Sequence, residues 1–234
     1  MLVESAPVVT ASEGGYFFVG FDRDAPPHAA ITVQDGGGSA VHDLAIAPGV
    51  YDIQRIDGLP QNTVTPTDPA LLERIAAEAK RKAVGFASNI DADHFKDGFI
   101  LPLQATRISG AFGGQRILNG VPSTPHYGTD MAAPVGTPIV SPGAGVVSFA
   151  ETGLHYEGGL VMIDHGQGVI SAYLHMSRVD VVAGQRLAQG DRVGLVGQEG
   201  RATGPHLCWR MKWRGRNLDP SLLVGARAPR AIRS

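Results

Sequence analysis

Three short stretches of the sequence carry side chains that bind metal ions or move protons. They are "PHYGTD", "SAYLHMS" and "PHLCW", which supply His126, Asp130, Tyr173, His175, His206 and Cys208. On a β-strand, residues two positions apart point to the same side, so His206 and Cys208 can face a common point, as can Tyr173 and His175. Imidazole, carboxylate and thiolate groups are all zinc ligands. The three stretches therefore predict a metal site if the fold brings them together.

The number of candidate ligands indicates what kind of metal site this would be. His126 and Asp130, with one ligand from the third stretch, make three protein ligands and leave a fourth position for water, as in catalytic zinc sites. His126 and Asp130 are four residues apart, a spacing that would place them on one face of a helix. Gly128 and the following "AAPVGTP" instead favour an extended turn. His175 and His206 then remain for proton transfer and for stabilising developing negative charge.

Composition indicates the class of fold that must position these residues. The 234 residues include 31 glycines and 16 prolines, which favours short strands joined by tight turns over a helical bundle. The formal net charge of −2 gives no general signal for nucleic-acid binding. No apolar run approaches the ~18 residues that span a bilayer, so we expect no transmembrane segment. The sequence predicts a mainly β protein.

The amino-terminal part, residues 1–66, reads as short strands separated by turns. Apolar residues alternate or cluster in "GGYFFVGF", "HAAITVQ", "SAVHDLAIA" and "YDIQRIDGL", and "DGGG" at 35–38 is a hairpin signal. We expect a small β-sandwich or barrel here. Such a domain could either position the substrate or cover the groove until it is displaced.

A helix is predicted in residues 67–100, which we expect to link two β-rich parts. Asp68 suits the N-cap and Pro69 the first helical position. The expected apolar stripe consists of Leu71, Leu72, Ile75, Ala76 and Ala79. The cations expected in the last turn, where they suit the helix dipole, are Lys80, Arg81 and Lys82.

Residues 101–224 predict an antiparallel β-sheet domain. "GTPIVSPGAGVVSFAE" and "GLVMIDHGQGVISAYLHM" suggest a meander with a tight turn at "DHGQG", "GQRLAQGDRVGLVG" continues it, and "PHLCWRMKW" is the expected last strand. The Lys and Arg residues from Arg210 onward, against the single acid Asp219, suggest a solubilising tail, with residues 225–234 as its end.

Four stretches together closely resemble the lysostaphin/LytM family of zinc peptidoglycan endopeptidases. They are "RISGAFGGQR", "HYGTDMAAPVGTPIVSPGAGVV", "IDHGQGVISAYLHMSRVDVVAGQRLAQGDRVGLVG" and "GRATGPHLCWRM", within residues 106–222. The resemblance implies that His126 and Asp130 bind zinc and that His175 and His206 act in catalysis. By position it also makes Cys208 the third ligand, where the family has histidine.

This departure from the family pattern has a chemical consequence. Zinc with two imidazoles and a carboxylate sums to +1, whereas one imidazole, one carboxylate and one thiolate sum to zero. A neutral site polarises a carbonyl and acidifies water less. We therefore expect a weaker or more alkaline-shifted hydrolase that is sensitive to oxidation of the thiol. The alternative is that Cys208 is a small buried hydrophobic residue, in which case the site has lost a ligand.

The resemblance implies an enzyme that hydrolyses peptide cross-links of bacterial peptidoglycan, with peptide stems as its partner. Arg116, Asn119 and Tyr173 are candidates for contacts with substrate. A second hypothesis is a degenerate, non-catalytic relative that binds the cell wall or activates another hydrolase. A third is a cytosolic metallo-hydrolase that acts on some other peptide.

Other features of the sequence bear on location and on competing sites. The start "MLVESAPVV" lacks a signal peptide, so the chain is either cytosolic or a mature form. The resemblance favours a periplasmic or secreted protein of the cell envelope. "NIDADHFKDG" fails the EF-hand spacing and suggests a solvated linker. We expect four histidines to be structural or on the surface, namely His28, His42, His155 and His165.

Overall fold

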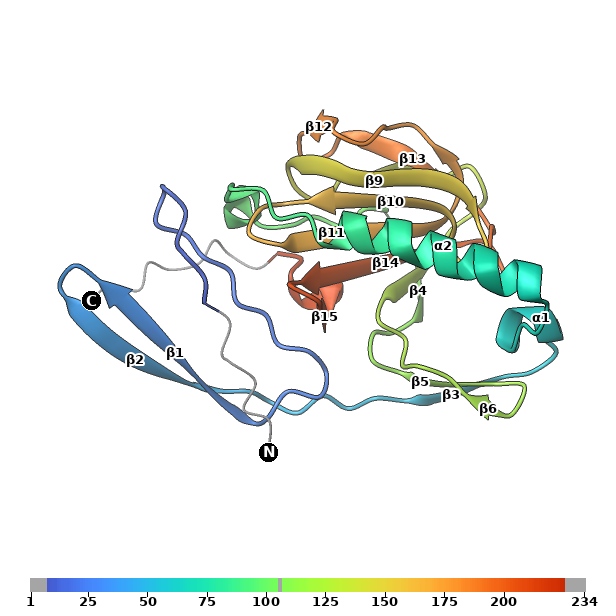
Figure 1. Ribbon diagram of the computed structural model, residues 1–234, viewed down its shortest axis with the longest axis horizontal. Helices are drawn as coiled ribbons and strands as arrows, with labels where there is room; N and C mark the ends of the chain where they lie inside the picture. Colours follow the sequence, from blue (N-terminus) through green and yellow to red (C-terminus); the bar gives the residue numbers. More distant parts are fainter. Residues whose placement is uncertain (1–7, 105–106, 226–234) are drawn as a thin grey trace.

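The computed structural model describes residues 8–104 and 107–225, and the fold is mainly β, as predicted (Figure 1). The first strands are β1 (His28–Asp35), β2 (Gly38–Ala45), β3 (Ile53–Ile56), β4 (Arg107–Gly110), β5 (Gln115–Leu118), β6 (Val121–Pro122), β7 (Thr129–Ala132) and β8 (Pro138–Val140). The others are β9 (Gly145–Leu154), β10 (Gly158–Asp164), β11 (Val169–Val179), β12 (Arg186–Leu187), β13 (Arg192–Val196), β14 (His206–Trp213) and β15 (Arg216–Leu218). The helices are α1 (Gln61–Val64) and α2 (Pro69–Phe86), with 3-10 turns at His94–Asp97 and Pro220–Leu222.

Ten strands form one large antiparallel sheet. Its main order is β12-β9-β10-β11-β14-β7-β4, with β13, β8 and β15 joined at its sides. The meander from β9 to β11 is confirmed, and its turn follows β10 at "HGQG", where Gly166, Gln167 and Gly168 all have positive φ. Strand β14 is followed by β15, so it is not the last strand. Because β14 pairs with both β11 and β7, it brings together all three stretches that carry the candidate residues.

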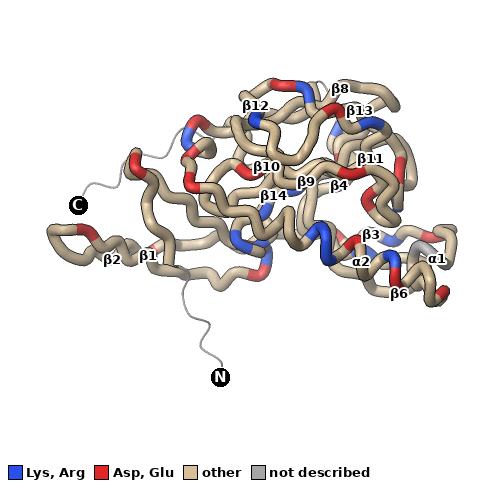
Figure 2. The backbone as a smooth tube through the Cα atoms, turned by 45° about the horizontal axis from the view of Figure 1, so that its top comes forward, with Lys and Arg blue, Asp and Glu red and all other residues tan. Residues whose placement is uncertain are grey.

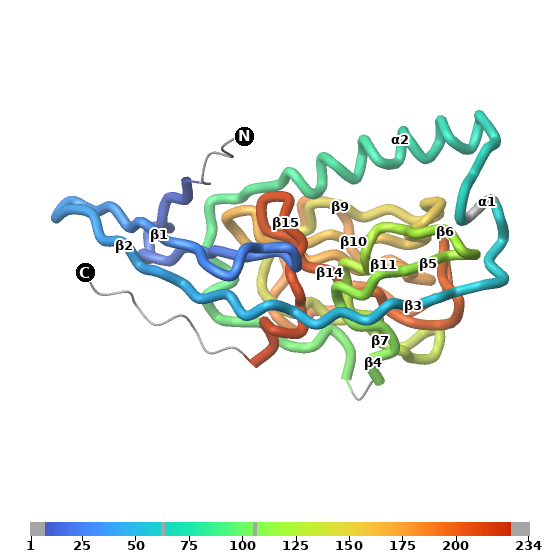
Figure 3. The backbone as a smooth tube through the Cα atoms, turned by 90° about the horizontal axis from the view of Figure 1, so that it is seen from below, coloured from blue at the N-terminus to red at the C-terminus, as the bar shows by residue number. Residues whose placement is uncertain are grey.

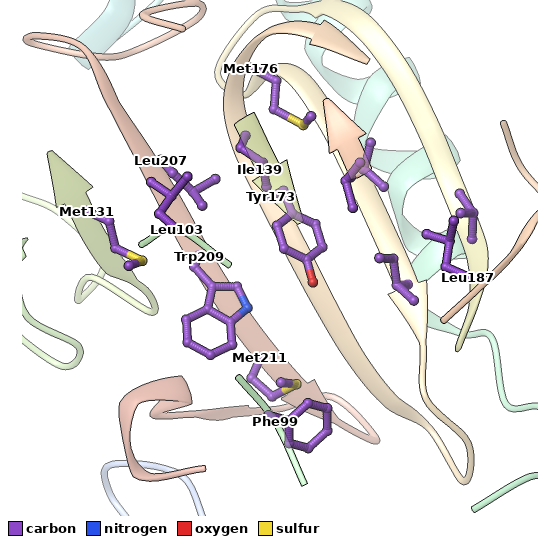
Figure 4. Packing of buried hydrophobic residues seen from close by; sticks show 14 of the residues in the cluster. Phe99, Leu103, Met131, Ile139, Tyr173, Met176, Leu187, Leu207, Trp209 and Met211 are labelled. Carbon is purple, nitrogen blue, oxygen red and sulfur yellow. The ribbon is translucent and has the colours of Figure 1, made fainter. Parts of the chain in front are cut away.

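Strand β14 separates a hydrophobic core from a polar face. Leu207, Trp209, Met211 and Trp213 alternate along it, and each is at most 1% exposed. Figure 4 shows Leu207, Trp209 and Met211 packed with Tyr173 in this core. Burying side chains of this size stabilises the fold by roughly 1.5–3 kcal/mol each. The alternate residues of β14, beginning with His206, therefore point to the opposite face.

The predicted helix is confirmed, but its end and its buried face differ from expectation. Asp68 caps α2 by accepting a hydrogen bond from the Ala70 amide. The helix continues to Phe86, so the cations expected in its last turn lie further back. Two of them form ion pairs with acids of β9 and the turn after it, Arg81 with Glu151 at 3.0 Å and Lys82 with Glu157 at 2.6 Å. Leu72, from the expected apolar stripe, is 44% exposed, whereas Glu78 is buried. The helix thus packs against the sheet partly through polar contacts.

No sandwich or barrel forms in the described part of the amino-terminal region. Strands β1 and β2 form an isolated hairpin that projects from the body, and β3 pairs in parallel with β5 (Figure 3). The predicted strand at 14–21 is absent. Its Phe18 instead packs on the main core, with its ring 5.6 Å from that of Phe95. The apolar residues of this region stabilise the larger unit, so no second core forms.

The expected basic tail begins later than the charge pattern suggested. Arg210 and Lys212 lie within β14, and Arg216 lies in β15. Residues 226–234 are outside the described residues, and the division of the chain into domains stays a prediction. Among the described residues, no helix combines the length and apolar character that crossing a bilayer requires.

Candidate metal centre

The fold brings the three proposed ligands to one point. Asp130 on β7 lies directly opposite Cys208 on β14, and His126 precedes β7. His126 Nε2 is 3.0 Å from Asp130 Oδ1 and 3.4 Å from Cys208 Sγ, and the ligand atoms of all three residues lie within 4.8 Å of one another. Ligand atoms of a tetrahedral zinc site, with bonds of 2.0–2.3 Å, are about 3.3–3.6 Å apart. The spacing therefore fits a metal ion.

The hydrogen bonds around His126 leave its Nε2 and Asp130 Oδ1 directed at the same space. His126 Nδ1 lies 3.2 Å from the Ala111 carbonyl, which can only accept, so Nδ1 carries the hydrogen and Nε2 presents a lone pair. Asp130 Oδ1 faces that lone pair and accepts no hydrogen bond, while Arg116 Nη2 holds Oδ2 at 2.6 Å. Two buried acceptors that face each other are unfavourable unless a cation lies between them. The donor set fits zinc.

Protonation of the three residues agrees with this arrangement. Burial lowers the pKa of His126 and keeps its ring neutral. Burial acts to raise the pKa of Asp130, but its polar neighbours, the Arg116 guanidinium among them, hold that pKa below its usual range. Burial raises the pKa of Cys208 to about 12, so the metal-free chain carries a thiol, and metal binding would release its proton. Cys208 is only 1% exposed, which removes the accessibility on which the expected sensitivity to oxidation depends.

His175 and His206 lie beside the proposed ligands, with ring centroids 4.7 Å apart. His175 Nδ1 donates to the Glu199 carbonyl and His206 Nδ1 to the Gly204 carbonyl, each at 2.8 Å. The Nε2 atom of each ring is therefore an acceptor. His206 Nε2 is 3.7 Å from Asp130 Oδ1. Burial, with a contribution from His206, lowers the pKa of His175 to about 3.

An irregularity in β11 turns His175 toward this pocket. Its φ of +66° is rare for a residue with a Cβ, and the register between β10 and β11 shifts beside it. Leu174 and His175 consequently both line the pocket although they are neighbours in sequence. The expectation that Tyr173 and His175 share a strand face is wrong. Tyr173 lies in the core, where its hydroxyl bonds to Ser171 Oγ at 2.7 Å (Figure 4).

The other two candidates for contacts with substrate are Arg116 and Asn119, and only Arg116 lines the pocket. Arg116 lines the pocket but is engaged with Asp130. The Asn119 side chain bonds to both the amide and the carbonyl of Leu59, at 3.0 and 2.8 Å, and so fastens the segment after β3 to the end of β5. Asn119 is absent from the pocket lining, so its contacts are those of a structural residue.

Several pocket residues were not anticipated from the sequence. The cavity, about 180 Å³, is also lined by Arg201 and Arg210, and by Tyr156, over which the Arg201 guanidinium lies at 4.8 Å. The Arg210 guanidinium lies close enough to the Cys208 sulfur to act on the pKa of its thiol, which it lowers against the larger effect of burial. The signal for Arg210 was present, because it follows Cys208 by two residues on β14 and shares its face. Arg201 lies in a loop, for which no such periodicity exists.

Comparison with known proteins finds similarity to a described family around this site. Residues 124–220 match the model of peptidase family M23. Over 96 residues the chain is 45% identical to the peptidoglycan DD-endopeptidase ShyA of Vibrio cholerae, covering 41% of this chain and 22% of that protein. Over 128 residues it is 39% identical to the DD-carboxypeptidase/endopeptidase Mpg of Neisseria meningitidis, covering 53% and 29%. The chain thus spans less than a third of the length of these two relatives.

Solved structures give the same relationship at the level of the fold. A Pseudomonas aeruginosa protein assigned to peptidase M23 superposes with a TM-score of 0.71 at 28% identity, over 94% of this chain and 85% of that one. A zinc-containing peptidase from Vibrio cholerae superposes with a TM-score of 0.51 at 21% identity, over 86% and 79%. The first of these similarities extends beyond residues 124–220 into the amino-terminal region.

Proposed function

We propose that this chain, whose residues 124–220 form a domain of peptidase family M23, is a zinc-dependent endopeptidase that hydrolyses peptide cross-links of bacterial peptidoglycan. The similarity to peptidoglycan DD-endopeptidases supports the substrate. One structural observation carries the proposal. His126 Nε2, Asp130 Oδ1 and Cys208 Sγ converge within 4.8 Å of one another, while two further histidines present acceptor nitrogens to the same space.

His126, Asp130 and Cys208 would hold the zinc. When bound, zinc polarises the scissile carbonyl and makes water a nucleophile near neutral pH. Arg116 fixes the carboxylate of Asp130 through Oδ2 and so leaves Oδ1 for the ion. The Ala111 carbonyl fixes the ring of His126 and its tautomer in the same way.

The two remaining histidines divide the proton transfers. His206 is the proposed proton acceptor, because its Nε2 carries no hydrogen and lies beside the ligand atoms, 3.7 Å from Asp130 Oδ1. After it has taken the proton, His206 Nε2–H can donate it to the leaving amine. The pKa of His175, about 3, keeps that ring neutral, so its Nε2 orients the attacking water as an acceptor. The backbone carbonyls of Glu199 and Gly204 hold both rings in this orientation.

A non-catalytic relative is the second candidate function, and the position of Cys208 is the observation that favours it. The sulfur packs in an apolar cluster with Leu160 and Leu174, as a structural cysteine would. A scaffold, however, has no use for a carboxylate oxygen facing an imidazole lone pair. We therefore favour the enzyme.

The location follows from the substrate. An enzyme that cuts peptidoglycan acts outside the cytoplasm, so we propose that the protein works in the periplasm or is secreted to the cell envelope. The peptide stems of peptidoglycan are its expected partner.

Two measurements test this function. Metal analysis of the purified protein should give about one zinc per chain, lost in Cys208→Ala. Digestion of purified peptidoglycan should release products of cross-link cleavage with the natural chain but not with His206→Ala. A folded chain without metal that releases no products would establish the scaffold instead.

A further inference from the structure

A second hollow lies beside the proposed metal centre, along β14. It lies between α2 and the polar face of β14, has a volume of about 710 Å³ and is lined by Phe86, Leu160 and Lys212 among others. Glu157, Leu174 and Arg210 line both hollows. The groove and the metal pocket are therefore adjacent and share part of their walls.

The charge of this groove is strongly positive. One acid, Glu157, lines it together with four cations from the two walls, namely Lys82, Arg210, Lys212 and Arg214. Figure 2 colours the Lys and Arg positions of the backbone blue and the Asp and Glu positions red. Lys82 neutralises Glu157 through their 2.6 Å ion pair, and Arg214 donates to the Val8 and Gln167 carbonyls. Three net positive charges therefore remain along the β14 wall.

Lys212 is the cation best placed to receive a ligand. Its ammonium lies 4.3 Å from the centre of the Phe86 ring across the groove, and among the described residues it has no acidic side chain within 4.0 Å. Arg210, two residues earlier on the same face, has a buried Nε without a hydrogen-bond partner. Phe86, Leu160 and Leu174 give the groove an apolar surface between these charges.

The spacing along β14 fixes how far such a ligand group lies from the cut bond. Cys208 and Lys212 are four residues apart, so their side chains are separated by about 13 Å along the strand. An extended peptide that lies parallel to β14 covers this distance in about four residues.

We propose that this groove binds a free carboxylate of the peptide substrate, carried three or four residues from the scissile bond, through Lys212 and Arg210. The inference rests on the proposed function and narrows its substrate to acidic peptides. An apolar surface with cations at intervals suits a peptide of small apolar residues that carries carboxylates. Charge-assisted hydrogen bonds to a carboxylate supply the selectivity.

The test compares two peptides of the same sequence, one with free carboxylates at that distance from the cut bond and one with these groups amidated. The natural chain should show a higher kcat/KM for the acidic peptide. Lys212→Gln should lower kcat/KM for the acidic peptide about tenfold and leave the amidated peptide unchanged. Lys80→Gln is the matched control, since Lys80 is an exposed lysine of α2 outside the groove lining. Thermal melting should show both variants folded.

The outcomes distinguish a failure of the groove inference from a failure of the proposed hydrolase activity. Cleavage of both peptides without preference, or equal losses in Lys212→Gln and Lys80→Gln, would overturn the inference and leave the enzyme standing. Binding of vesicles with anionic lipid that depends on Lys212, without peptide preference, would assign the groove to a lipid headgroup and also overturn it. If neither peptide is cut, the hydrolase fails. Fluorescence anisotropy of the labelled acidic peptide then tests whether the groove binds it. Binding that is weaker in Lys212→Gln but unchanged in Lys80→Gln supports the inference, and equal binding by both variants and the natural chain overturns it.

Discussion

His126 and His165 are both buried beside the large sheet, at 3% and 0% exposure, and each donates its Nδ1 hydrogen to a backbone carbonyl. They differ at the other nitrogen. His165 Nε2 accepts from Ser171 Oγ at 2.7 Å, and Ser171 Oγ in turn bonds to the Tyr173 hydroxyl. His126 Nε2 faces a carboxylate oxygen and a sulfur, and that oxygen accepts no hydrogen bond.

The comparison shows that burial and residue type do not distinguish a structural histidine from a functional one. Hydroxyl groups supply hydrogens, so the cluster at His165 is complete without a ligand. The cluster at His126 leaves Asp130 Oδ1 without a donor, and a metal ion would satisfy this oxygen. What separates the two sites is the hydrogen-bonding capacity of the atom opposite Nε2.

Asp130→Asn should convert the proposed metal centre into a site like that of His165. The amide nitrogen can donate to His126 Nε2 while the amide oxygen accepts from Arg116, so the cluster is satisfied without a metal. We expect zinc content to fall to background and hydrolysis to fall by about 10³-fold or more. The metal-free variant should be at least as stable as the metal-free natural chain, since it contains no unpaired buried carboxylate.

Zinc analysis, cleavage assays and urea unfolding of the metal-free proteins measure these three effects. Asp43→Asn, on the exposed hairpin, is the matched control and should change none of them. Retention of one zinc per chain by Asp130→Asn would contradict the assignment of Asp130 as a ligand.

His206→Ala should separate proton transfer from metal binding. His206 lies next to the ligands without being one of them, so we expect kcat to fall by about 10²–10⁴-fold with zinc content unchanged. Steady-state kinetics and zinc analysis on the same preparation check this, with His28→Ala on the hairpin as a control. Loss of zinc in His206→Ala would show that this residue is a ligand, and the roles would have to be reassigned.

The sequence was informative where a periodic element carries the residues. Strict alternation along β14 predicted that His206 and Cys208 share a face, and the same rule places Arg210 beside them. It failed for Tyr173 and His175, because a bulge and a positive φ at His175 depend on tertiary packing that no local pattern records. The amino-terminal sandwich failed for a related reason, since Phe18 and its neighbours pack on a core formed by distant residues.

His165→Gln should lower the free energy of unfolding at pH 7 and make that free energy depend less on pH between 6.5 and 4. Burial lowers the pKa of His165 to about 4, whereas an unfolded histidine titrates near 6.5. As pH falls from 6.5 to 4, the unfolded state takes up a proton that the folded state does not, so this residue removes roughly 3 kcal/mol of stability over that range. The variant loses this slope and, at pH 7, about 1–3 kcal/mol from the broken hydrogen bonds.

Urea unfolding at pH 7 and pH 4.5 measures both effects. Part of the slope should remain, because His126 and His175 also have lowered pKa values. Hydrolysis per folded molecule at pH 7 should match the natural chain, in contrast to His206→Ala. Equal pH slopes in His165→Gln and the natural chain would show that His165 does not stay neutral in the folded state.

Cys208→His should give the smallest of these effects and sharpen the account of the metal centre. The histidine ligand raises the formal charge of the zinc site from zero to +1, so the acidic limb of the pH–rate profile should move to lower pH by about one unit. Arg210 limits this shift in the natural chain, because the positive charge of its guanidinium near Cys208 offsets the negative charge of a thiolate. Superimposable profiles would mean that the sulfur does not set the charge of the site.

A double-mutant cycle separates the ligand from its guanidinium partner. In an Arg210→Met background the thiolate charge is no longer offset, so Cys208→His should shift the profile further than it does in the natural chain. Equal shifts in both backgrounds would show that Arg210 serves the groove alone. Because Arg210 lines both hollows, this cycle also decides whether one side chain couples the charge of the metal centre to the binding of an acidic substrate.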